Sequence, residues 1–234
     1  MLRQLRRHAG LSQLALSLMT GISQRHLSCI ETDRAKPSPA TLHSVLTALE
    51  VPLEQCNSVF LAAGFAPRYL TTPLTSPAME AVRDAITHVL HANNPAPAIV
   101  IGSHWEVLAA NASTQVLFGL VGLAADAAQG LNLLDTLLRP GGLGDHLINA
   151  NEIKNIAWQR ATREAIGNPT LAELLERLPA PDEPASLVAE LPPLVLTRIN
   201  SLQGELSFLS TFTTFGMPLD ITVTSLRIEH LIPA

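Results

Sequence analysis

Gln24 and Arg25 are adjacent polar side chains whose chemistry matches the hydrogen-bonding edges of DNA bases. A glutamine amide can form two hydrogen bonds with adenine, and an arginine guanidinium can form two with guanine. Each such pair contributes about 1–3 kcal/mol of discrimination against the wrong base. Both side chains must then project from an element that fits the major groove, and an α-helix does.

The surrounding residues, 11–37, predict two short helices joined by a tight turn. Ser12 is suited to the N-cap of the first, because a serine oxygen accepts a hydrogen bond from a free first-turn N–H. Leu14 and Leu18 are four residues apart and share one face of that helix. Gly21 is expected to end it, since glycine adopts a positive φ at low cost, and Ser23 is expected to cap the next helix.

The second of these helices has an apolar face and a polar one. Leu27 and Ile30 continue the apolar face at helical spacing, which leaves Gln24 and Arg25 on the outer surface. This is the arrangement of a helix-turn-helix, whose second helix enters the major groove. The alternative is a solvated helix face. We expect phosphate or secondary DNA contacts from Gln13, Ser23, His26, Ser28, Arg34 and Lys36, a weaker one from Arg3, and a structural role at the helix end for Glu31.

The segment GLSQLALSLMTGISQRHLSCIETDRAKPS (10–38) resembles the helix-turn-helix of Cro/repressor-type (XRE) bacterial transcription regulators. It combines GLSQ, a Gly-Ile-Ser turn, a glutamate at the end of the recognition helix and a basic loop closed by proline. Three later segments resemble regulators of this type that carry an MmyB-like, PAS-like ligand-binding domain: AAGFAP (62–67), PAIVIGSHWEVLAANAS (97–113) and LSFLSTFTTFGMPLDITVTSLRIEHLIPA (206–234). The resemblance implies a regulator that binds an operator as a homodimer.

The charge distribution agrees with DNA binding by the first part of the chain only. The net charge is −5 over 234 residues. Residues 1–70 contain seven Lys/Arg and four Asp/Glu, for a net charge of +3, so the remainder carries −8. A basic module joined to an acidic body is expected to use only the module against phosphates.

The apolar periodicity predicts an α+β protein of two domains. Residues 1–66 are expected to form an all-α helix-turn-helix domain of five helices, in which Ser38-Pro39 starts the fourth helix and Pro52 the fifth. Residues 67–78, with several prolines and threonines, are expected to be a linker. Since the first helix starts at Met1, the native start could lie further upstream.

Residues 79–234 contain strand-like and helical runs in an order that suits a PAS-like domain. A helix over 79–91 precedes two short strands, 98–101 and 105–109, and Asn111 is expected to cap the helix that follows. Three further helices and an exposed proline-rich loop (179–193) lead to strands at 194–199, 205–215 and 221–228. The resemblance implies that this five-stranded antiparallel sheet curls over the inserted helices and leaves a pocket, and that this domain binds a ligand or dimerises.

If such a pocket exists, the low aromatic content of 4% favours an aliphatic lining and an apolar ligand, such as a fatty-acyl compound. The residues expected to bind it are Trp105, Leu108, Asn111, Leu117, Leu134, Leu138, His146, Trp158, Phe208 and Phe212. His104, Asn111, His146 and Arg227 are candidates for holding a polar head group. For any one apolar residue, the alternative is ordinary packing in a hydrophobic core.

Other classes of protein find little support in the sequence. It has no G-x-S-x-G elbow, phosphate-binding glycine loop or zinc-ligand spacing, so we expect neither an enzyme nor a metal site. Cys29 is expected to pack as a small apolar residue, and His88 and His91 to lie on a solvated face. Without a signal peptide or an apolar run of membrane-spanning length, we expect a cytoplasmic protein that makes no membrane contact.

The sequence therefore predicts a DNA-binding transcription regulator, a repressor in our interpretation. A small apolar ligand would shift the dimer between geometries that do and do not fit DNA, and no other cofactor is expected. The alternative is a regulator whose second domain is only a scaffold for dimerisation or protein interaction. The regulated genes and the operator sequence do not follow from these residues.

Overall fold

The structure is a computed structural model that describes residues 1–124, 130–166, 168–182 and 194–234. It divides the chain into two compact units. The first comprises Met1–Thr71 with Leu219–Ile221, and the second comprises Thr72–Pro218 with Thr222–Ala234. The change from the first unit to the second, after Thr71, falls within the segment that we propose as the linker.

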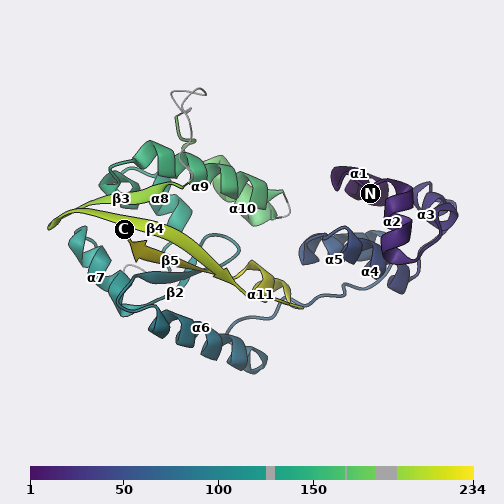
Figure 1. The fold of residues 1–234 in the computed structure, drawn as a ribbon, viewed down its shortest axis with the longest axis horizontal. Helices are drawn as coiled ribbons and strands as arrows, with labels where there is room; N and C mark the ends of the chain where they lie inside the picture. The colour runs from purple at the N-terminus through teal and green to yellow at the C-terminus, as the bar shows by residue number, and fades with distance from the viewer. Residues whose placement is uncertain (125–129, 167, 183–193) are drawn as a thin grey trace. The chain divides into compact units, whose positions relative to one another are not determined.

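The first unit contains five helices (Figure 1), which are α1 (Leu2–His8), α2 (Gln13–Thr20), α3 (Gln24–Glu31), α4 (Pro39–Ala48) and α5 (Leu53–Ala62). The predicted caps are confirmed: the side chains of Ser12, Ser23 and Ser38 each accept a hydrogen bond from the first turn of the helix that follows. Each cap satisfies one of the free N–H groups at a helix start.

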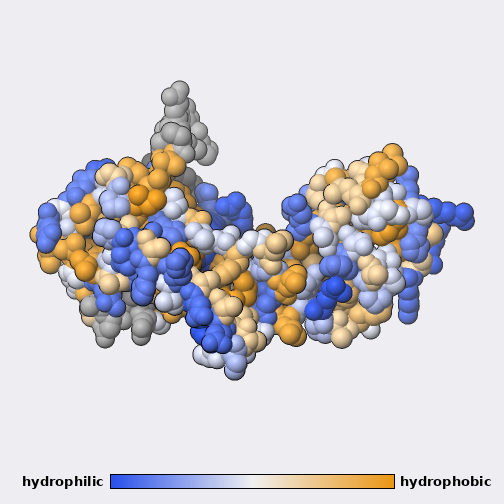
Figure 2. All heavy atoms as spheres, turned by 60° about the horizontal axis from the view of Figure 1, so that its bottom comes forward, coloured by the Kyte–Doolittle hydropathy of each residue, from blue (hydrophilic) through white to orange (hydrophobic). Residues whose placement is uncertain are grey.

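Apolar side chains from all five helices form the core of this unit. Leu16, Leu27, Val45 and Leu49 make one buried cluster, and a second surrounds Leu42 and Phe60. The shared face proposed for Leu14 and Leu18 is not the buried one: these side chains are 55% and 77% exposed, whereas Leu16 is 1% exposed. Figure 2 shows apolar residues in orange among polar ones on the visible face of each unit.

The described residues of the second unit form one sheet with helices on both of its faces (Figure 1). Its helices are the short 3-10 helix η1 (Pro77–Met79), α6 (Glu80–Ala92), α7 (Ala112–Leu120), α8 (Leu133–Leu138), the 3-10 helix η2 (Leu143–His146), α9 (Ala150–Ala165), α10 (Pro169–Arg177) and α11 (Ile221–Ser225). Its strands are β1 (Ala98–Ile101), β2 (Val107–Ala110), β3 (Leu196–Ser201), β4 (Gly204–Thr214) and β5 (Arg227–Pro233).

The five strands form an antiparallel sheet in the order β2-β1-β5-β4-β3. The helices α7 to α10 lie between β2 and β3 in the chain. This arrangement confirms the predicted α+β fold with a PAS-like second domain, in which the sheet encloses inserted helices.

The two faces of the sheet can be told apart at β1, because successive side chains of a strand point to opposite faces. Ala98 and Val100 pack with Ile86 and Leu90 of α6. Ile99 and Ile101 pack instead with Phe118 of α7 and its neighbours. Both faces of β1 are therefore covered, and α7 lies on the face opposite α6.

One predicted strand is wrong in part. Residues 221–228 were expected to be extended because they are rich in Ile, Val and Thr, but Ile221–Ser225 form the short helix α11 and β5 begins only at Arg227. Ile221, Val223 and Leu226 are buried, so tertiary packing overrides the local β-propensity of this segment. Residues 183–193 of the predicted exposed loop lie outside the described part of the chain.

Candidate functional site

The turn between α2 and α3 takes the form that the sequence predicts. Gly21 ends α2 with a φ of 70°, in the left-handed region that glycine tolerates best, and its N–H donates to the carbonyl of Ser17. The Ser23 hydroxyl then accepts a hydrogen bond from the backbone N–H of His26 at 3.2 Å. Three residues thus separate two helices, each with a defined end.

The first turn of α3 presents its polar side chains to solvent. Gln24, Arg25 and His26 are exposed, while Leu27 and Ile30 are buried against the rest of the unit. Because side chains three residues apart share one face of a helix, burial of Leu27 and Ile30 leaves the polar side chains at the start of α3 exposed on the opposite face. Side chains at the start of the second helix of a helix-turn-helix meet base edges, and base contact by Gln24 and Arg25 stays a prediction.

An ion pair and a hydrogen bond to Glu31 fix the C-terminal end of α3. Nε of Arg6 lies 2.6 Å from Oε1 of Glu31, and the Gln13 amide nitrogen donates to Oε2 of Glu31 at 2.9 Å. The hydrogen bond from Arg6 holds the pKa of Glu31 below its ordinary value and raises that of Arg6. The same Arg6 guanidinium donates to the carbonyl of Leu11 at 2.8 Å. One buried arginine therefore ties together α1, the residue before the N-cap of α2 and the end of α3.

The residues predicted to make phosphate or secondary contacts fall into two groups. Ser23, His26, Arg34 and Lys36 are exposed, as is Arg3 on α1, whereas Ser28 is half-buried. Gln13 is also half-buried, and its amide is already engaged by Glu31. A phosphate contact from Gln13 would therefore use the second hydrogen of its amide nitrogen. Otherwise the side chain would have to rotate away from Glu31.

The second unit contains a cavity of about 480 Å³ between the sheet and helices α7 to α9. Most of its lining is aliphatic, including Ile99, Leu117, Leu137, Ile153 and Leu231. This volume lies in the range typical of small-molecule sites, which are concave and mostly apolar.

The strand register explains why charged groups meet in this cavity. Arg227 of β5 lies beside Ile101 of β1, and Glu229 lies between Ile99 of β1 and Phe212 of β4. Because directly paired residues share one face of a sheet, the two charged side chains lie on the same face as Ile99 and Ile101, the face covered by α7.

Arg227 is the most buried charged residue of this group, at 7% exposure. Its Nη1 donates to Oε2 of Glu164 at 3.1 Å, and its guanidinium carbon lies 4.5 Å from the centre of the Trp105 ring. Glu164 also accepts from Nε1 of Trp105 at 2.8 Å and from Nε of Arg160 at 2.8 Å. A single carboxylate of α9 thus receives donors from two arginines and a tryptophan.

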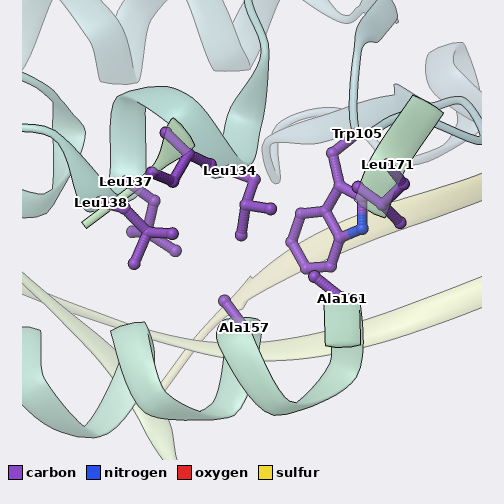
Figure 3. Close-up of a cluster of buried hydrophobic side chains, with 8 residues drawn as sticks. Trp105, Leu134, Leu137, Leu138, Ala157, Ala161 and Leu171 are labelled. Atoms are coloured by element: carbon purple, nitrogen blue, oxygen red, sulfur yellow. The ribbon is translucent and has the colours of Figure 1, made fainter. Parts of the chain in front are cut away.

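Trp105 occupies a strained backbone position beside this group. Its φ is 65°, in the left-handed region that a bulky residue enters at a cost of about 1–3 kcal/mol. Its carbonyl accepts from the N–H of Leu133 at 2.8 Å, and its ring packs among Leu134, Ala161 and Leu171 (Figure 3). These contacts hold the strained residue in place, so the ring faces both the core and the cavity.

The residues predicted to bind a ligand are only partly brought together. Trp105, Leu117, His146 and Phe212 line the cavity. The others lie elsewhere. Leu134 and Leu138 are packed in the core shown in Figure 3, and Trp158 packs against that core. Phe208 is buried in a neighbouring cluster, Leu108 is exposed on β2, and Asn111 caps α7. Core packing, the alternative noted for each apolar residue, accounts for the buried members of this group.

Five polar lining residues are absent from the set that the sequence predicts: Thr114, Arg160, Thr197, Ser210 and Glu229. Arg227 was selected as a head-group candidate and does line the cavity, whereas His104 does not. A signal for Glu229 was present, since Arg227 and Glu229 alternate with apolar residues in the last strand. Alternation of charge and apolar side chains usually marks a solvated face, and here it marks the face that borders the cavity.

The described residues contain no group of three or more His, Cys, Asp or Glu placed to hold a metal ion. Within these residues Cys29 and Cys56 are free thiols, and burial raises the pKa of Cys56 to about 11. Such a thiol is protonated near neutral pH and reacts poorly. No helix in the described ranges has the length and hydropathy needed to cross a bilayer.

Comparison with known proteins finds a matching family model for each of the two units. The family model described as MmyB-like transcription regulator ligand binding domain matches residues 82–234, and the helix-turn-helix model matches residues 2–56. No curated protein matches the chain. A solved structure, described as "Structure of an RNA-binding Light-Oxygen-Voltage Receptor", is 16% identical, with a TM-score of 0.31. The match covers 99% of this chain and 58% of that one.

The two matched segments stand in the order that the structure shows: a helix-turn-helix followed by an α+β domain with a cavity. The match to the ligand-binding domain alone covers more than half of the chain. The chain therefore belongs to the MmyB-like transcription regulators, with a DNA-binding helix-turn-helix at its N-terminus and the ligand-binding domain of that family after it.

Proposed function

We propose that this regulator is a repressor that binds its operator as a homodimer and is controlled by a small apolar ligand, such as a fatty-acyl compound, in the second domain. The observation that carries the ligand part is the cavity of about 480 Å³ with its aliphatic lining. An apolar ligand gains free energy from leaving water for such a lining, at roughly 25 cal/mol for each Å² of apolar surface buried.

The DNA part assigns base reading to Gln24 and Arg25. Both are exposed at the start of α3, and the Arg6–Glu31 pair fixes the far end of that helix. Exposed Arg34 and Lys36 in the loop after α3 supply positive charge for phosphates. Dimerisation is proposed because one module of this size buries little surface on DNA, and two half-sites multiply its specificity.

The base-reading role is tested by selecting bound sequences from a pool of random duplexes with the full-length protein. We expect enrichment of two half-sites related by two-fold symmetry, with centres one helical turn or a multiple of it apart. On the selected duplex, Arg25→Ala should weaken binding by about tenfold or more at fixed salt. The matched control is Arg7→Ala, which removes the same charge from an exposed site on α1.

If Arg25→Ala and Arg7→Ala weaken binding equally, Arg25 supplies only charge and does not read a base. If no sequence is enriched, specific DNA recognition by this chain is contradicted. Circular dichroism of each variant distinguishes a lost contact from a lost fold.

The second candidate is a domain that serves only as a dimerisation or interaction scaffold. Native mass spectrometry of the purified protein, followed by solvent extraction, separates the two. The ligand proposal predicts a co-purified apolar molecule, or a rise in the midpoint of thermal unfolding with members of a set of alkyl compounds. A protein of bare chain mass whose midpoint no compound raises supports the scaffold.

A further inference from the structure

The side chain of Asn57 in α5 holds the chain where it leaves the helix-turn-helix. Its Oδ1 accepts hydrogen bonds from the backbone N–H groups of Arg68 and Tyr69, both at 2.9 Å, and its Nδ2 donates to the carbonyl of Tyr69 at 2.8 Å. One amide thus bonds the backbone of two consecutive residues as both donor and acceptor. Arg68 and Tyr69 lie in the segment proposed as the linker, and they are fixed to α5 within the first unit.

The side chain of Tyr69 strengthens this anchor. It packs against the core cluster that contains Phe60, and its hydroxyl lies 3.3 Å from Nδ1 of His43 on α4. The same helix α4 supplies Val45 to the cluster in which Leu27 of α3 is buried. Tyr69 is therefore part of the packing that supports the recognition helix, and a pull on the chain after it is resisted by the core of the first unit.

A second anchor fixes the chain where it enters the second unit. Nη1 of Arg83 in α6 donates to the carbonyls of Leu74 and Ser76, at 2.5 Å and 2.7 Å. The Leu74 side chain packs against the buried cluster that includes Val100 of β1 and Ile228 of β5. Both residues of this anchor belong to the second unit. The chain is therefore tied to α6 and to the sheet before α6 begins.

The chain between the two anchors, residues 70–73, is short, and we call it the strap. From Tyr69 to Leu74 there are five Cα–Cα steps, which span at most about 18 Å when fully extended. Pro73 fixes its own φ and restricts the residue before it, which stiffens the strap further. Covalent geometry thus limits how far the anchored end of one unit lies from the anchored start of the other, whatever contacts the strap residues make.

We propose that this doubly anchored strap holds each helix-turn-helix on a short tether, so that the homodimer accepts one spacing of half-sites on its operator. This inference rests on the proposed homodimer and specifies what limits its choice of operator. Half-sites of a dimeric helix-turn-helix lie about 34 Å apart, and each added base pair shifts one by about 3.4 Å and rotates it by about a tenth of a turn. A short tether leaves little freedom to follow such a shift.

A series of duplexes that differ only in half-site spacing tests this. One, two or four base pairs are added between the half-sites of the selected duplex, and the affinity of the full-length protein is measured by fluorescence anisotropy at fixed salt. Two-site binding is lost when the geometry forbids both contacts at once, so two added base pairs should weaken wild-type binding by about tenfold or more.

A longer strap should remove most of this penalty. Insertion of Gly-Ser-Gly-Ser between Thr71 and Thr72 lengthens the strap and leaves the bonds of Asn57 and Arg83 in place. Two added base pairs should then weaken binding by only about threefold or less. The matched control is the same insertion between Leu202 and Gln203, in the exposed turn between β3 and β4; it should keep the wild-type penalty.

The anchor at Asn57 has a readout of its own. Arg68 is exposed, so trypsin cleaves after it once the backbone there comes free of α5. Asn57→Ala removes three hydrogen bonds and should speed this cleavage, located by fragment mass, by about tenfold or more. The matched control is Ser58→Ala, at an exposed neighbour whose hydroxyl donates within α5 to the carbonyl of Glu54. Circular dichroism shows that each variant is folded.

The outcomes separate this inference from the function on which it rests. If the wild type tolerates every spacing, or if the lengthened strap keeps the full penalty, the strap does not set the spacing, while the homodimer stands. Loss of the penalty in the control insertion overturns the inference as well. Unchanged cleavage after Arg68 in Asn57→Ala contradicts the anchor on α5. If the selection enriches single half-sites only, the proposed homodimer fails on the operator, and the inference fails with it.

Discussion

Arg6 and Glu31 form a buried salt bridge that joins the first helix to the end of the third. Nε of Arg6 lies 2.6 Å from Oε1 of Glu31 and Nη2 lies 2.7 Å from Oε2, so both carboxylate oxygens are engaged by one guanidinium. The two side chains are only 10% and 3% exposed. This pair sets the position of α3, the helix on which Gln24 and Arg25 lie.

Removing one partner of this pair should destabilise the first unit. Arg6→Gln leaves the Glu31 carboxylate buried without its cation, and breaking such a pair costs about 3 kcal/mol. Arg7→Gln, at an exposed site on the same helix, should cost less than about 0.5 kcal/mol. Urea unfolding of the full chain measures both by far-UV circular dichroism. Trp105 and Trp158 report the second unit separately, because both tryptophans of the chain lie there. Equal stability of the two variants would contradict a stabilising role for the pair.

The same pair predicts a pH dependence. The hydrogen bond from Arg6 lowers the pKa of Glu31 in the folded state below its ordinary value of 4.5. The stabilisation is therefore complete above that unfolded-state value and is lost as the pH falls through the lower, folded-state pKa. Urea midpoints of the first unit should fall in this acid range for the wild type and fall less steeply for Glu31→Gln. Parallel curves for the two proteins would show that Glu31 titrates alike in the folded and unfolded states.

Glu229 should show the opposite dependence. Burial raises its pKa in the folded state, so the cost of ionising it appears as the pH rises above the ordinary value of 4.5. Arg227 and Arg160 partly offset this cost. Glu229→Gln should therefore unfold at a higher temperature than the wild type in the alkaline range and at about the same temperature in acid. The control is Glu205→Gln at an exposed pair with Arg198, where the pKa is lowered and no alkaline gain is expected. A loss of stability in Glu229→Gln at alkaline pH would contradict a buried carboxyl that resists ionisation.

Two glycine-to-alanine substitutions should change the free energy of unfolding in opposite directions. Gly21 has a φ of 70° and no atom within 4 Å of an added Cβ, so Gly21→Ala should cost about 1–2 kcal/mol from backbone strain alone. Gly119 lies within α7, also in open space but without a positive φ, and Gly119→Ala should stabilise the second unit by about 0.5–1 kcal/mol. Denaturant unfolding checks both. Stabilisation by Gly21→Ala would mean that the turn before α3 does not need the left-handed conformation.

The first unit could be predicted from the sequence almost residue by residue, because its signals are local. Ser12, Ser23 and Ser38 each cap the helix that follows them, and Gly21 takes the left-handed conformation that ends α2. Such contacts lie within a few residues of each other and need no knowledge of the fold. Exposure of Leu14 and Leu18 was not predictable in this way, since which face of α2 is buried depends on where α3 and α4 pack.

In the second unit, the strand positions were predicted better than the cavity. The strand order β2-β1-β5-β4-β3 places β1 beside β5, from opposite ends of the domain. That pairing brings Arg227 to Ile101, and packing of α9 then brings Glu164 to Arg227. Leu134 and Leu138 were expected in the cavity but lie in the core beneath Trp105, because one face of α8 packs against α9 and α10. Aliphatic composition alone does not distinguish a cavity wall from a core.

The central claim, that a ligand in the second domain controls DNA binding by the first, is tested most directly by one titration. Fluorescence anisotropy gives the affinity of the full-length protein for its selected duplex with and without saturating decanoate at fixed salt. We predict that decanoate changes this affinity by about fivefold or more, the lower end of usual coupling between two sites. If decanoate binds the wild type and the duplex affinity stays the same, the cavity does not control the helix-turn-helix, and the account is contradicted.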